Sequence, residues 1–387
     1  MARRIIFFMI YRDFQNLKLS ALGLGTMRLP LVDGKYNQID EDAAAEMFDY
    51  AMKQGINYYD TAFAYHEGQS EIVTGKLLRR YPRESYYIAT KFPGYDLSNL
   101  TKVEEIFEKQ LEKTGLDYFD FYLFHNVNET NIDAYLDPKY GIYEYLLEQK
   151  KNGRIHHLGF STHGDLDVMK RFLDAYGENM EFCQIQLNYV DWTLQKAKEK
   201  VELIASYGIP VWVMEPLRGG KLANIAEADK AELMALRPDE TVPAWGFRFL
   251  QSLPQVTMVL SGMSNFTQLK ENIETFSADK PLNETEMSGL LHVADNMMKR
   301  IVLPCTACRY CTEKCPRGLN IPNLLEIYNE YCFTGGGFLP AMQLSVFPED
   351  KQPKACIGCR SCEAVCPQQI KISEAMKDFA EKMNRKE

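Results

Sequence analysis

The chain has 387 residues, of which 46% are hydrophobic and 25% charged, as in a globular protein with room for two or three domains. The formal net charge is −9, and the acidic excess lies in the first 300 residues, which excludes the basic stripe that nucleic-acid binding requires. The apolar run at residues 5–10 is too short for a membrane helix or a secretory signal. We therefore expect a cytoplasmic protein without a membrane span, and we assign no function to residues 1–8.

Short apolar stretches alternate with amphipathic segments through about the first 275 residues. The expected strands are residues 20–24, 56–59, 86–89, 119–124, 155–160, 182–187, 211–214 and 256–260. Amphipathic segments such as 41–54, 101–114 and 195–207 predict helices between them. Strands that alternate with helices in this way indicate an α/β fold, a (β/α)8 TIM barrel. A doubly wound sheet is the main alternative, but only Gly23 and Gly25 occur where its G-x-G-x-x-G motif would follow the first strand.

Polar side chains stand at the ends of three consecutive expected strands. Asp60 ends the second strand, with Tyr65 in the loop that follows, while Lys91 ends the third and His125 the fourth. Catalytic residues of such barrels lie at the carboxyl ends of the strands, so we expect these four to converge. Each has an ordinary structural explanation when taken alone, such as a helix cap, a packed ring or a solvated charge.

Together the four residue types can reduce a carbonyl group. Tyr65 would donate a proton to the carbonyl oxygen, and Lys91 would lower the pKa of that phenol. Asp60 would hold Lys91 in place, and His125 would bind and orient the substrate oxygen.

The run Tyr-Asp-Thr-Ala-Phe-Ala-Tyr at 59–65, Thr-Lys at 90–91 and Leu-Phe-His-Asn at 123–126 resembles the aldo/keto reductase superfamily, whose catalytic tetrad is Asp, Tyr, Lys and His. The resemblance covers about residues 9–276 and includes Gly-Leu-Gly-Thr-Met at 23–27 and Gly-Phe-Ser-Thr-His at 159–163. It implies a nicotinamide cofactor, NAD(H) or NADP(H), and a small carbonyl or alcohol substrate.

The same resemblance implies where the cofactor would bind. Ser161 and Gln184 would contact the nicotinamide carboxamide, the loop 216–221 would follow the pyrophosphate, and residues 264–272 would surround the adenosine. In that loop Gly219 and Gly220 allow close approach of the backbone, although an ordinary turn is the alternative explanation. The expected cofactor-binding residues are Gly25, Thr26, Met27, Ser161, Gln184, Met214, Pro216, Leu217, Arg218, Gly220, Lys221, Gly262, Ser264, Gln268, Glu271 and Asn272.

Two positions depart from the better-known members of the superfamily. Gly262, Met263 and Gln268 occupy the segment that commonly carries Lys and Arg to bind a 2′-phosphate, so we expect NADH to bind at least as well as NADPH. Met214 stands where an aromatic ring often stacks on the nicotinamide, and its flexible thioether offers a softer surface.

Nine of the ten cysteines lie in the last part of the chain, and eight of these nine form the pattern C-x2-C-x2-C-x3-C-P, which occurs twice. In two-cluster ferredoxins the fourth cysteine of each motif binds the other cluster. The pattern therefore predicts one 4Fe–4S cluster on Cys305, Cys308, Cys311 and Cys366, and a second on Cys356, Cys359, Cys362 and Cys315. A pair of four-cysteine zinc sites is the alternative. The remaining Cys183 and Cys332 are expected to be buried small residues.

We expect three segments: an aldo/keto reductase barrel at 9–276, a connecting helical segment at 277–304, and a small, mainly helical ferredoxin-like domain at 305–387. Helices are expected at 321–331 and 373–383, so this domain resembles the two-cluster type of respiratory and anaerobic enzymes. Its near-neutral charge suggests a tethered relay or a structural element.

Three hypotheses for the function follow. The first is a nicotinamide-dependent oxidoreductase whose clusters serve electron transfer or structure. The second is an electron-transfer protein whose barrel is a docking or binding scaffold for a redox partner protein, and the third is a zinc-stabilised scaffold. The complete tetrad favours the first, and the cysteine pattern disfavours the third.

Overall fold

The computed structural model describes residues 9–301, 303, 305, 310–366 and 368–384, so the first eight residues lie outside the described part. The chain forms two compact units. The first contains Met1–Ile225 and Arg237–Met287, and the second contains Ala226–Leu236 and Ser288–Glu387. Within the described residues, every helix is too short or too polar to cross a lipid bilayer.

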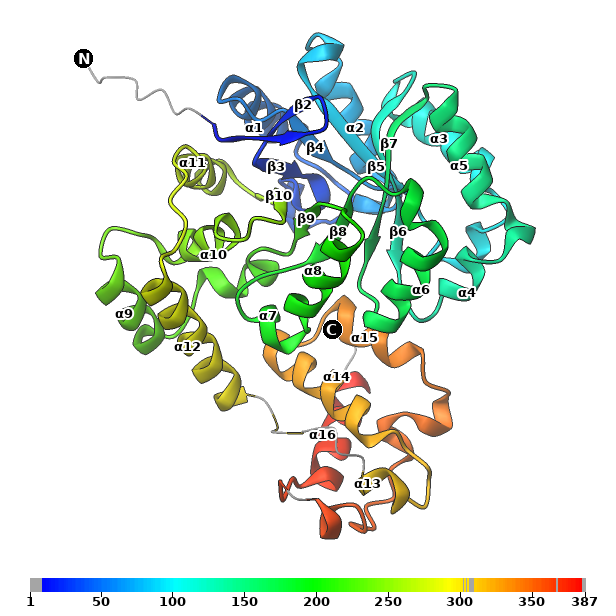
Figure 1. Ribbon diagram of the computed structural model, residues 1–387, viewed down its shortest axis with the longest axis vertical. Helices are drawn as coiled ribbons and strands as arrows, with labels where there is room; N and C mark the ends of the chain where they lie inside the picture. The colour runs from blue at the N-terminus through cyan, green and yellow to red at the C-terminus, as the bar shows by residue number, and fades with distance from the viewer. Residues whose placement is uncertain (1–8, 302, 304, 306–309, 367, 385–387) are drawn as a thin grey trace. The chain divides into compact units, whose positions relative to one another are not determined.

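The first unit is a closed barrel of eight parallel strands in the order β10-β3-β4-β5-β6-β7-β8-β9, which confirms the predicted (β/α)8 fold (Figure 1). The pairing of Leu260 with Gly23 closes the ring between the last strand and the first. The strands are β3 (Leu22–Gly25), β4 (Tyr58–Asp60), β5 (Tyr87–Phe92), β6 (Phe119–Val127), β7 (Ile155–Thr162), β8 (Cys183–Gln186), β9 (Val211–Met214) and β10 (Val256–Ser261).

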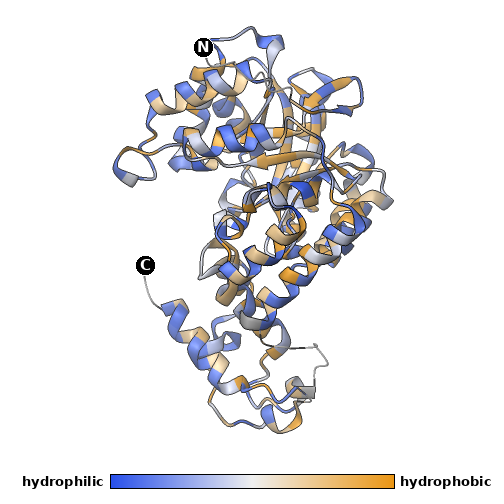
Figure 2. Ribbon diagram, turned by 90° about the vertical axis from the view of Figure 1, so that its left-hand side faces the viewer, coloured by the Kyte–Doolittle hydropathy of each residue, from blue (hydrophilic) through white to orange (hydrophobic). Residues whose placement is uncertain are grey.

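Helices cover the outside of the barrel and bury an apolar stripe against it, as the hydrophobic strands and two-toned outer helices in Figure 2 show. Local sequence sets where they begin and end: Asp40 caps α1 by accepting from the Ala43 N–H at 3.0 Å, and Gly115 ends α3 with φ 65°. The helices are α1 (Glu41–Lys53), α2 (Gln69–Leu78), α3 (Val103–Thr114), α4 (Ile132–Tyr135), α5 (Ile142–Lys151), α6 (Leu166–Tyr176), α7 (Asp191–Leu194), α8 (Ala197–Ser206), α10 (Val242–Gln251) and α11 (Phe266–Thr275).

An antiparallel hairpin, β1 (Tyr11–Phe14) and β2 (Leu17–Ser20), precedes the barrel and was not expected from the sequence. Phe14 and Leu19 are buried in the core formed by inward-facing barrel residues. The Phe14 ring lies 5.7 Å from the Phe121 ring and 5.0 Å from the Trp212 ring. The hairpin therefore fills the amino-terminal end of the barrel with apolar side chains, and the polar site lies at the other end.

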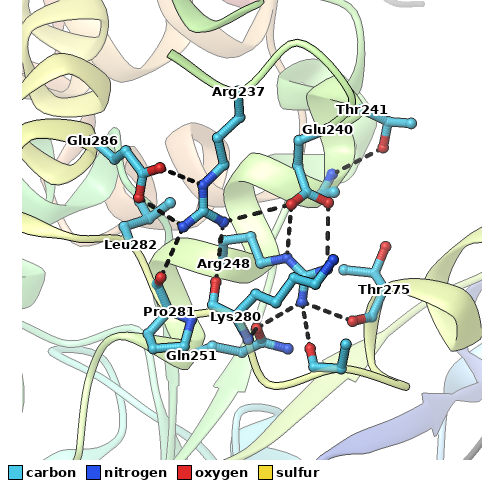
Figure 3. Close-up of polar contacts among 12 residues, drawn as sticks. Arg237, Glu240, Thr241, Arg248, Gln251, Thr275, Lys280, Pro281, Leu282 and Glu286 are labelled. Atoms are coloured by element: carbon cyan, nitrogen blue, oxygen red, sulfur yellow. Dashed lines mark hydrogen bonds and ion pairs between the residues drawn. The ribbon is translucent and has the colours of Figure 1, made fainter.

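A cluster of two arginines and two glutamates fixes the chain as it leaves the barrel (Figure 3). Arg248, on α10, donates to the Thr275 carbonyl at 2.8 Å and pairs with Glu240 at 3.1 Å. Arg237 pairs with Glu286 at 2.6 Å and donates to the carbonyl of Pro281 at 2.9 Å, so the segment after α11 is held to α10 by charged hydrogen bonds.

The second unit is helical among its described residues. Its elements are α9 (Glu227–Leu236), most of α12 (Glu284–Ile301), α13 (Tyr310–Glu313), α14 (Ile321–Thr334), α15 (Phe338–Ser345) and α16 (Ile372–Asn384). The helices predicted at 321–331 and 373–383 are confirmed as α14 and α16, which share a core that includes Leu325, Met376 and Phe379. The place of α9 in this unit was not expected. It packs on α12 so closely that a Cβ at Gly289 would lie 2.5 Å from the Leu236 side chain.

Candidate functional site

The structure brings Asp60, Tyr65, Lys91 and His125 together at the carboxyl ends of β4, β5 and β6. The backbone of β4 pairs with that of β5, and β5 with β6, so the three strands present their side chains side by side. Lys91 Nζ lies 2.7 Å from Asp60 Oδ1 and 5.2 Å from the centroid of the Tyr65 ring. The Tyr65 and His125 rings are 6.1 Å apart between centroids.

Lys91 and Asp60 form a buried ion pair. Lys91 Nζ also donates to the Thr61 carbonyl at 2.7 Å, whereas Asp60 Oδ2 has no hydrogen-bond partner among the described residues. Burial lowers the pKa of Lys91 and raises the pKa of Asp60, and the attraction between the two charges opposes both shifts. The charge of Lys91 is therefore balanced mainly by Asp60.

Tyr65 is half-buried and follows β4 at the mouth of the barrel. Burial and then the charge of Asp60 raise the pKa of Tyr65 well above its usual value. The expected fall in the pKa of Tyr65 is therefore wrong, because burial and the charge of Asp60 raise this pKa despite the nearby Lys91. Tyr65 is protonated at neutral pH, which suits a proton donor.

His125 is a neutral imidazole. Burial, and then the charge of Lys91, lower the pKa of His125 well below its usual value. Its Nδ1 is buried and has no hydrogen-bond partner in the described part of the chain. Tyr95 contacts the His125 ring edge-on, with 5.0 Å between the centroids. A neutral ring held in this way can offer one N–H to a substrate oxygen without adding charge.

The loop that carries Tyr65 is fixed by the next residue. His66 has a left-handed backbone (φ 52°) and is fully buried. Its ring nitrogens lie 2.7 Å from the Tyr36 carbonyl oxygen and 3.0 Å from the Thr26 carbonyl oxygen. These contacts tie the Tyr65 loop to the segments that follow β3.

Three expected nicotinamide contacts lie at the same end of the barrel: Ser161 on β7, Gln184 on β8 and Met214 on β9. Gln184 is buried, and its Oε1 has no hydrogen-bond partner within the residues that the structure describes. Its Nε2 faces Met214 Sδ at 3.7 Å, and Ser161 Oγ accepts from the Asn126 N–H at 2.8 Å. A buried amide with an unused oxygen is a group that binds a carboxamide, so these residues fit a nicotinamide.

The loop after β9 is a tight turn with an unusual backbone. Glu215 (φ 56°), Arg218 (φ 49°), Gly219 (φ 64°) and Gly220 (φ 91°) all adopt positive φ. Within the turn, the Arg218 and Gly220 N–H groups donate to the Glu215 and Leu217 carbonyls at 3.0 and 2.9 Å. Pro216 is buried and Leu217 half-buried in this turn, which holds the loop against the barrel.

The two basic residues of this loop, Arg218 and Lys221, differ in their surroundings. Arg218 is buried, and its guanidinium lies 2.8 Å from Asp191 Oδ1. Its charge is therefore paired inside the protein, where it joins this loop to the start of α7. Lys221 is exposed and remains free to meet a ligand.

The other expected cofactor residues lie in two loops. After β3, Gly25 is half-buried, Met27 is 43% exposed, and Thr26 is buried and donates to the Asp60 carbonyl at 2.9 Å. Of the expected residues that follow β10, four are exposed: Gly262, Ser264, Gln268 and Glu271. Asn272 is buried and donates to Ser261 Oγ at 3.1 Å, so its side chain supports the end of β10.

The sequence reasoning missed Arg28. Its side chain lies between the loops after β9 and β10, since a Cβ at Gly262 or at Gly219 would come within 3.2 Å of it. Its Nη2 lies 3.6 Å from Glu215 Oε1. The signal that could have found it is its position directly after the Gly-Leu-Gly-Thr-Met motif, at the end of a barrel strand.

Four cysteines from both motifs line one cavity in the second unit: Cys315, Cys356, Cys359 and Cys362, the set predicted for one cluster. The cavity has about 350 Å³ of empty space, part of it open to solvent. Burial, with smaller contributions from Cys356 and Cys315, raises the pKa of Cys362 to about 11, so these thiols are neighbours. The donors fit an iron–sulfur cluster, which is held by cysteine thiolates.

Three cysteines of the other predicted set, Cys305, Cys311 and Cys366, pack on the core of the second unit, and Cys308 lies outside the described residues. Among the residues that are described, no three His, Cys, Asp or Glu side chains converge on a point as ligands of a single ion do. A cubane needs no such convergence, because each thiolate binds its own iron.

Comparison with known proteins places this geometry in a family. The model of the aldo/keto reductase family matches residues 21–293, and that of a 4Fe-4S dicluster domain matches residues 304–371. The chain belongs to the aldo/keto reductase family and is an oxidoreductase that carries an iron–sulfur domain.

Individual relatives agree with this assignment. The "NADH-specific methylglyoxal reductase" of Escherichia coli is 24% identical over 301 residues, 67% of this chain and 90% of that protein. The "Probable aldo-keto reductase 1" of Glycine max is 28% identical over 53% of this chain, and the match spans only 58% of that relative's length. A solved aldo-keto reductase from Bacillus halodurans (holo form) has a TM-score of 0.60 and 27% identity, covering 74% of this chain and 96% of that one.

Proposed function

We propose that the barrel reduces small carbonyl compounds with NADH or NADPH and, in reverse, oxidises the alcohols. The observation that carries the proposal is a protonated Tyr65 beside the Lys91–Asp60 ion pair and the neutral His125, all at one barrel mouth. The name of the E. coli relative supports NADH and a small carbonyl substrate.

Each of the four residues has a role in this reaction. A bound nicotinamide supplies the hydride to the carbonyl carbon. His125 donates a hydrogen bond that orients the carbonyl oxygen toward Tyr65, and Tyr65 gives its proton to that oxygen as negative charge develops. Lys91, held by Asp60, provides the nearby cation that stabilises the phenolate left on Tyr65.

The chain would hold the cofactor with residues from five strand ends. Gln184 and Ser161 would bind the carboxamide, and the positive-φ turn of Gly219 and Gly220 would face the pyrophosphate. Gly25, Thr26, Met27, Met214, Pro216, Leu217, Arg218 and Lys221 would complete the groove, with Gly262, Ser264, Gln268, Glu271 and Asn272 beside the adenosine.

We further propose two 4Fe–4S clusters with crossed ligation, on Cys305, Cys308, Cys311 and Cys366 and on Cys356, Cys359, Cys362 and Cys315. The cavity that Cys315 shares with the second motif supports the crossing. The clusters would serve electron exchange with a redox partner protein, or structure. Cysteines that bind iron–sulfur clusters suit a reducing, cytoplasmic compartment. The proposed bounds are 9–276 for the barrel, 277–304 for the connection and 305–387 for the cluster domain.

The test is turnover of a panel of aldehydes, methylglyoxal and quinones with NADH and NADPH under anaerobic conditions. Tyr65→Phe should lower kcat at least about 100-fold, the usual cost of lost general acid catalysis, and leave cofactor affinity unchanged by fluorescence titration. Tyr11→Phe, which removes the phenolic hydroxyl of a 45% exposed tyrosine on the amino-terminal hairpin, is the control. Equal rates for wild type and Tyr65→Phe on every substrate would remove the tetrad from the reaction and favour electron transfer with the barrel as a scaffold.

A further inference from the structure

A further buried ion pair lies outside the barrel wall, between α2, α3 and β5. Glu71, on α2, is fully buried, and its Oε2 lies 2.5 Å from Lys113 Nζ on α3. Its Oε1 accepts from the Thr90 hydroxyl at 2.6 Å and from Gln110 Nε2 at 2.8 Å. Successive strand residues point to opposite faces, so Thr90 faces these helices while Lys91 faces the barrel interior.

This network holds the backbone beside two residues of the tetrad. Gln110 Nε2 lies 3.0 Å from the carbonyl oxygen of Lys91. Lys113 Nζ lies 3.1 Å from the carbonyl oxygen of Phe63, two residues before Tyr65. One carboxylate therefore links the strand that carries Lys91 to the loop that carries Tyr65.

The network leaves little freedom to its members. Tyr122 donates to Gln110 Oε1 at 2.6 Å, which fixes the orientation of the amide. A Cβ at Gly75 would lie 2.2 Å from the Thr114 carbonyl oxygen, so α2 and α3 are in direct backbone contact. If Glu71 moved, Gln110 and Lys113 would move with it, because close packing leaves no space for them to adjust separately. The backbone at Lys91 and Phe63, to which they donate, would then shift as well.

Charge provides a second link to the tetrad. Burial lowers the pKa of Lys91, and the negative charges of Asp60 and then Glu71 oppose that shift. If the network only held the fold together, removing the charge of Glu71 would leave the ionisation of Lys91 unchanged. If the charge also acts on Lys91, its removal would change the pH at which Lys91 loses its proton. The two explanations therefore differ in the pH dependence of turnover.

We propose that Glu71 is a positioning residue for the tetrad, and this inference rests on the proposed function. From outside the barrel wall it fixes Lys91 and the Tyr65 loop through Gln110 and Lys113, and it helps to keep Lys91 charged. Glu71 makes no contact with substrate in this role.

The first experiment removes the charge with little change in shape. Glu71→Gln should leave the affinity for NADH unchanged, lower kcat by about tenfold, and move the alkaline limb of the kcat profile by about half a pH unit toward lower pH. Lys113→Met should move the same limb toward higher pH, because it leaves the Glu71 charge unbalanced. Opposite shifts distinguish an electrostatic effect from general loosening of the fold.

The matched control is Glu41→Gln. Glu41, on α1, pairs at 2.5 Å with Lys76 on α2, the helix that also carries Glu71. Both side chains of this pair are exposed. This variant should keep the wild-type kcat and pH profile. An alkaline limb in Glu71→Gln that coincides with that of Glu41→Gln would overturn the inference.

Amide hydrogen exchange provides a readout that does not depend on turnover. Peptides from residues 61–68 and 87–92 should exchange faster in Glu71→Gln than in Glu41→Gln, because Lys113 and Gln110, the donors to the Phe63 and Lys91 carbonyls, are then held less firmly. If wild type and Tyr65→Phe turn over equally, the proposed function has failed, and exchange alone decides the inference. Faster exchange in these two peptides then supports it, and unchanged exchange overturns it.

Discussion

Lys91 Nζ lies 2.7 Å from Asp60 Oδ1 and 5.2 Å from the centroid of the Tyr65 ring, so the cation of the tetrad is paired with the carboxylate and lies beside the aromatic ring. Burial consequently decides the acidity of Tyr65, and the proton stays on the phenol at neutral pH. This arrangement favours proton donation, which carbonyl reduction requires, over proton removal, which alcohol oxidation requires.

The two directions of the reaction should therefore respond differently to pH. Burial and the Asp60 charge raise the pKa of Tyr65, so the fraction of phenolate rises about tenfold per pH unit below that pKa. The kcat for alcohol oxidation should rise steeply from about pH 7 to about pH 9, while the kcat for reduction should not rise. Steady-state assays with oxidised and reduced nicotinamide measure both. An oxidation rate that is already constant below about pH 8 would contradict this account.

Arg28 should contribute to cofactor binding although no motif pointed to it. Its side chain lies between the loops after β9 and β10, where a dinucleotide would cross the barrel mouth. Arg28→Met should weaken binding by about tenfold, or ~1.4 kcal/mol. If the guanidinium serves the pyrophosphate, NADH and NADPH should lose affinity equally in fluorescence titrations. A loss confined to NADPH would place the 2′-phosphate there instead, and no loss for either would exclude Arg28 from the site.

The features that the sequence predicted are those set by local pattern. Apolar stretches between amphipathic segments predicted the barrel strands, and the strand-end positions of Asp60, Lys91 and His125 predicted that they converge. The cysteine spacing likewise predicted that Cys315 would join the second motif, whose cavity it lines.

The features that it did not predict depend on tertiary contacts. Each strand of the β1–β2 hairpin has only four residues, which is too short for a clear sequence pattern. The hairpin is recognised by the burial of Phe14 inside the barrel, a tertiary contact. The pKa of Tyr65 was predicted to fall because the sequence shows a nearby lysine but not the desolvation of the phenol. Arg28 meets Gly262 across more than two hundred residues of chain, which no periodicity reveals.

Iron content should report the crossed ligation. Two cubanes require about eight iron atoms per chain, and Cys315→Ala should reduce this toward about four, because the cluster of the second motif loses its fourth ligand. Cys332→Ala should leave iron unchanged, because Cys332 lies outside both motifs on α14. Iron and sulfide assays on anaerobically purified protein measure both variants. Full iron content in Cys315→Ala, or stoichiometric zinc in the wild type, would contradict crossed 4Fe–4S ligation.

Removal of Arg248 should destabilise the barrel strongly. The residue is 3% exposed, and its guanidinium pairs with Glu240 and donates to the carbonyls of Thr275 and Ala278 at 2.8 and 2.6 Å. Arg248→Met leaves these acceptors buried without their donor, and breaking a buried pair in this way costs about 3–5 kcal/mol.

The control for this prediction is an exposed pair of similar geometry. Lys170 and Asp174 lie 2.7 Å apart on α6, with more than half of each side chain exposed. Solvent screens such a pair, so Lys170→Met should change the free energy of unfolding by less than about 1 kcal/mol. Urea unfolding followed by circular dichroism compares the two variants with wild type. If Arg248→Met is no more destabilising than Lys170→Met, Arg248 does not hold the chain as it leaves the barrel, and the contacts of Arg237 with Glu286 and Pro281 must hold it instead.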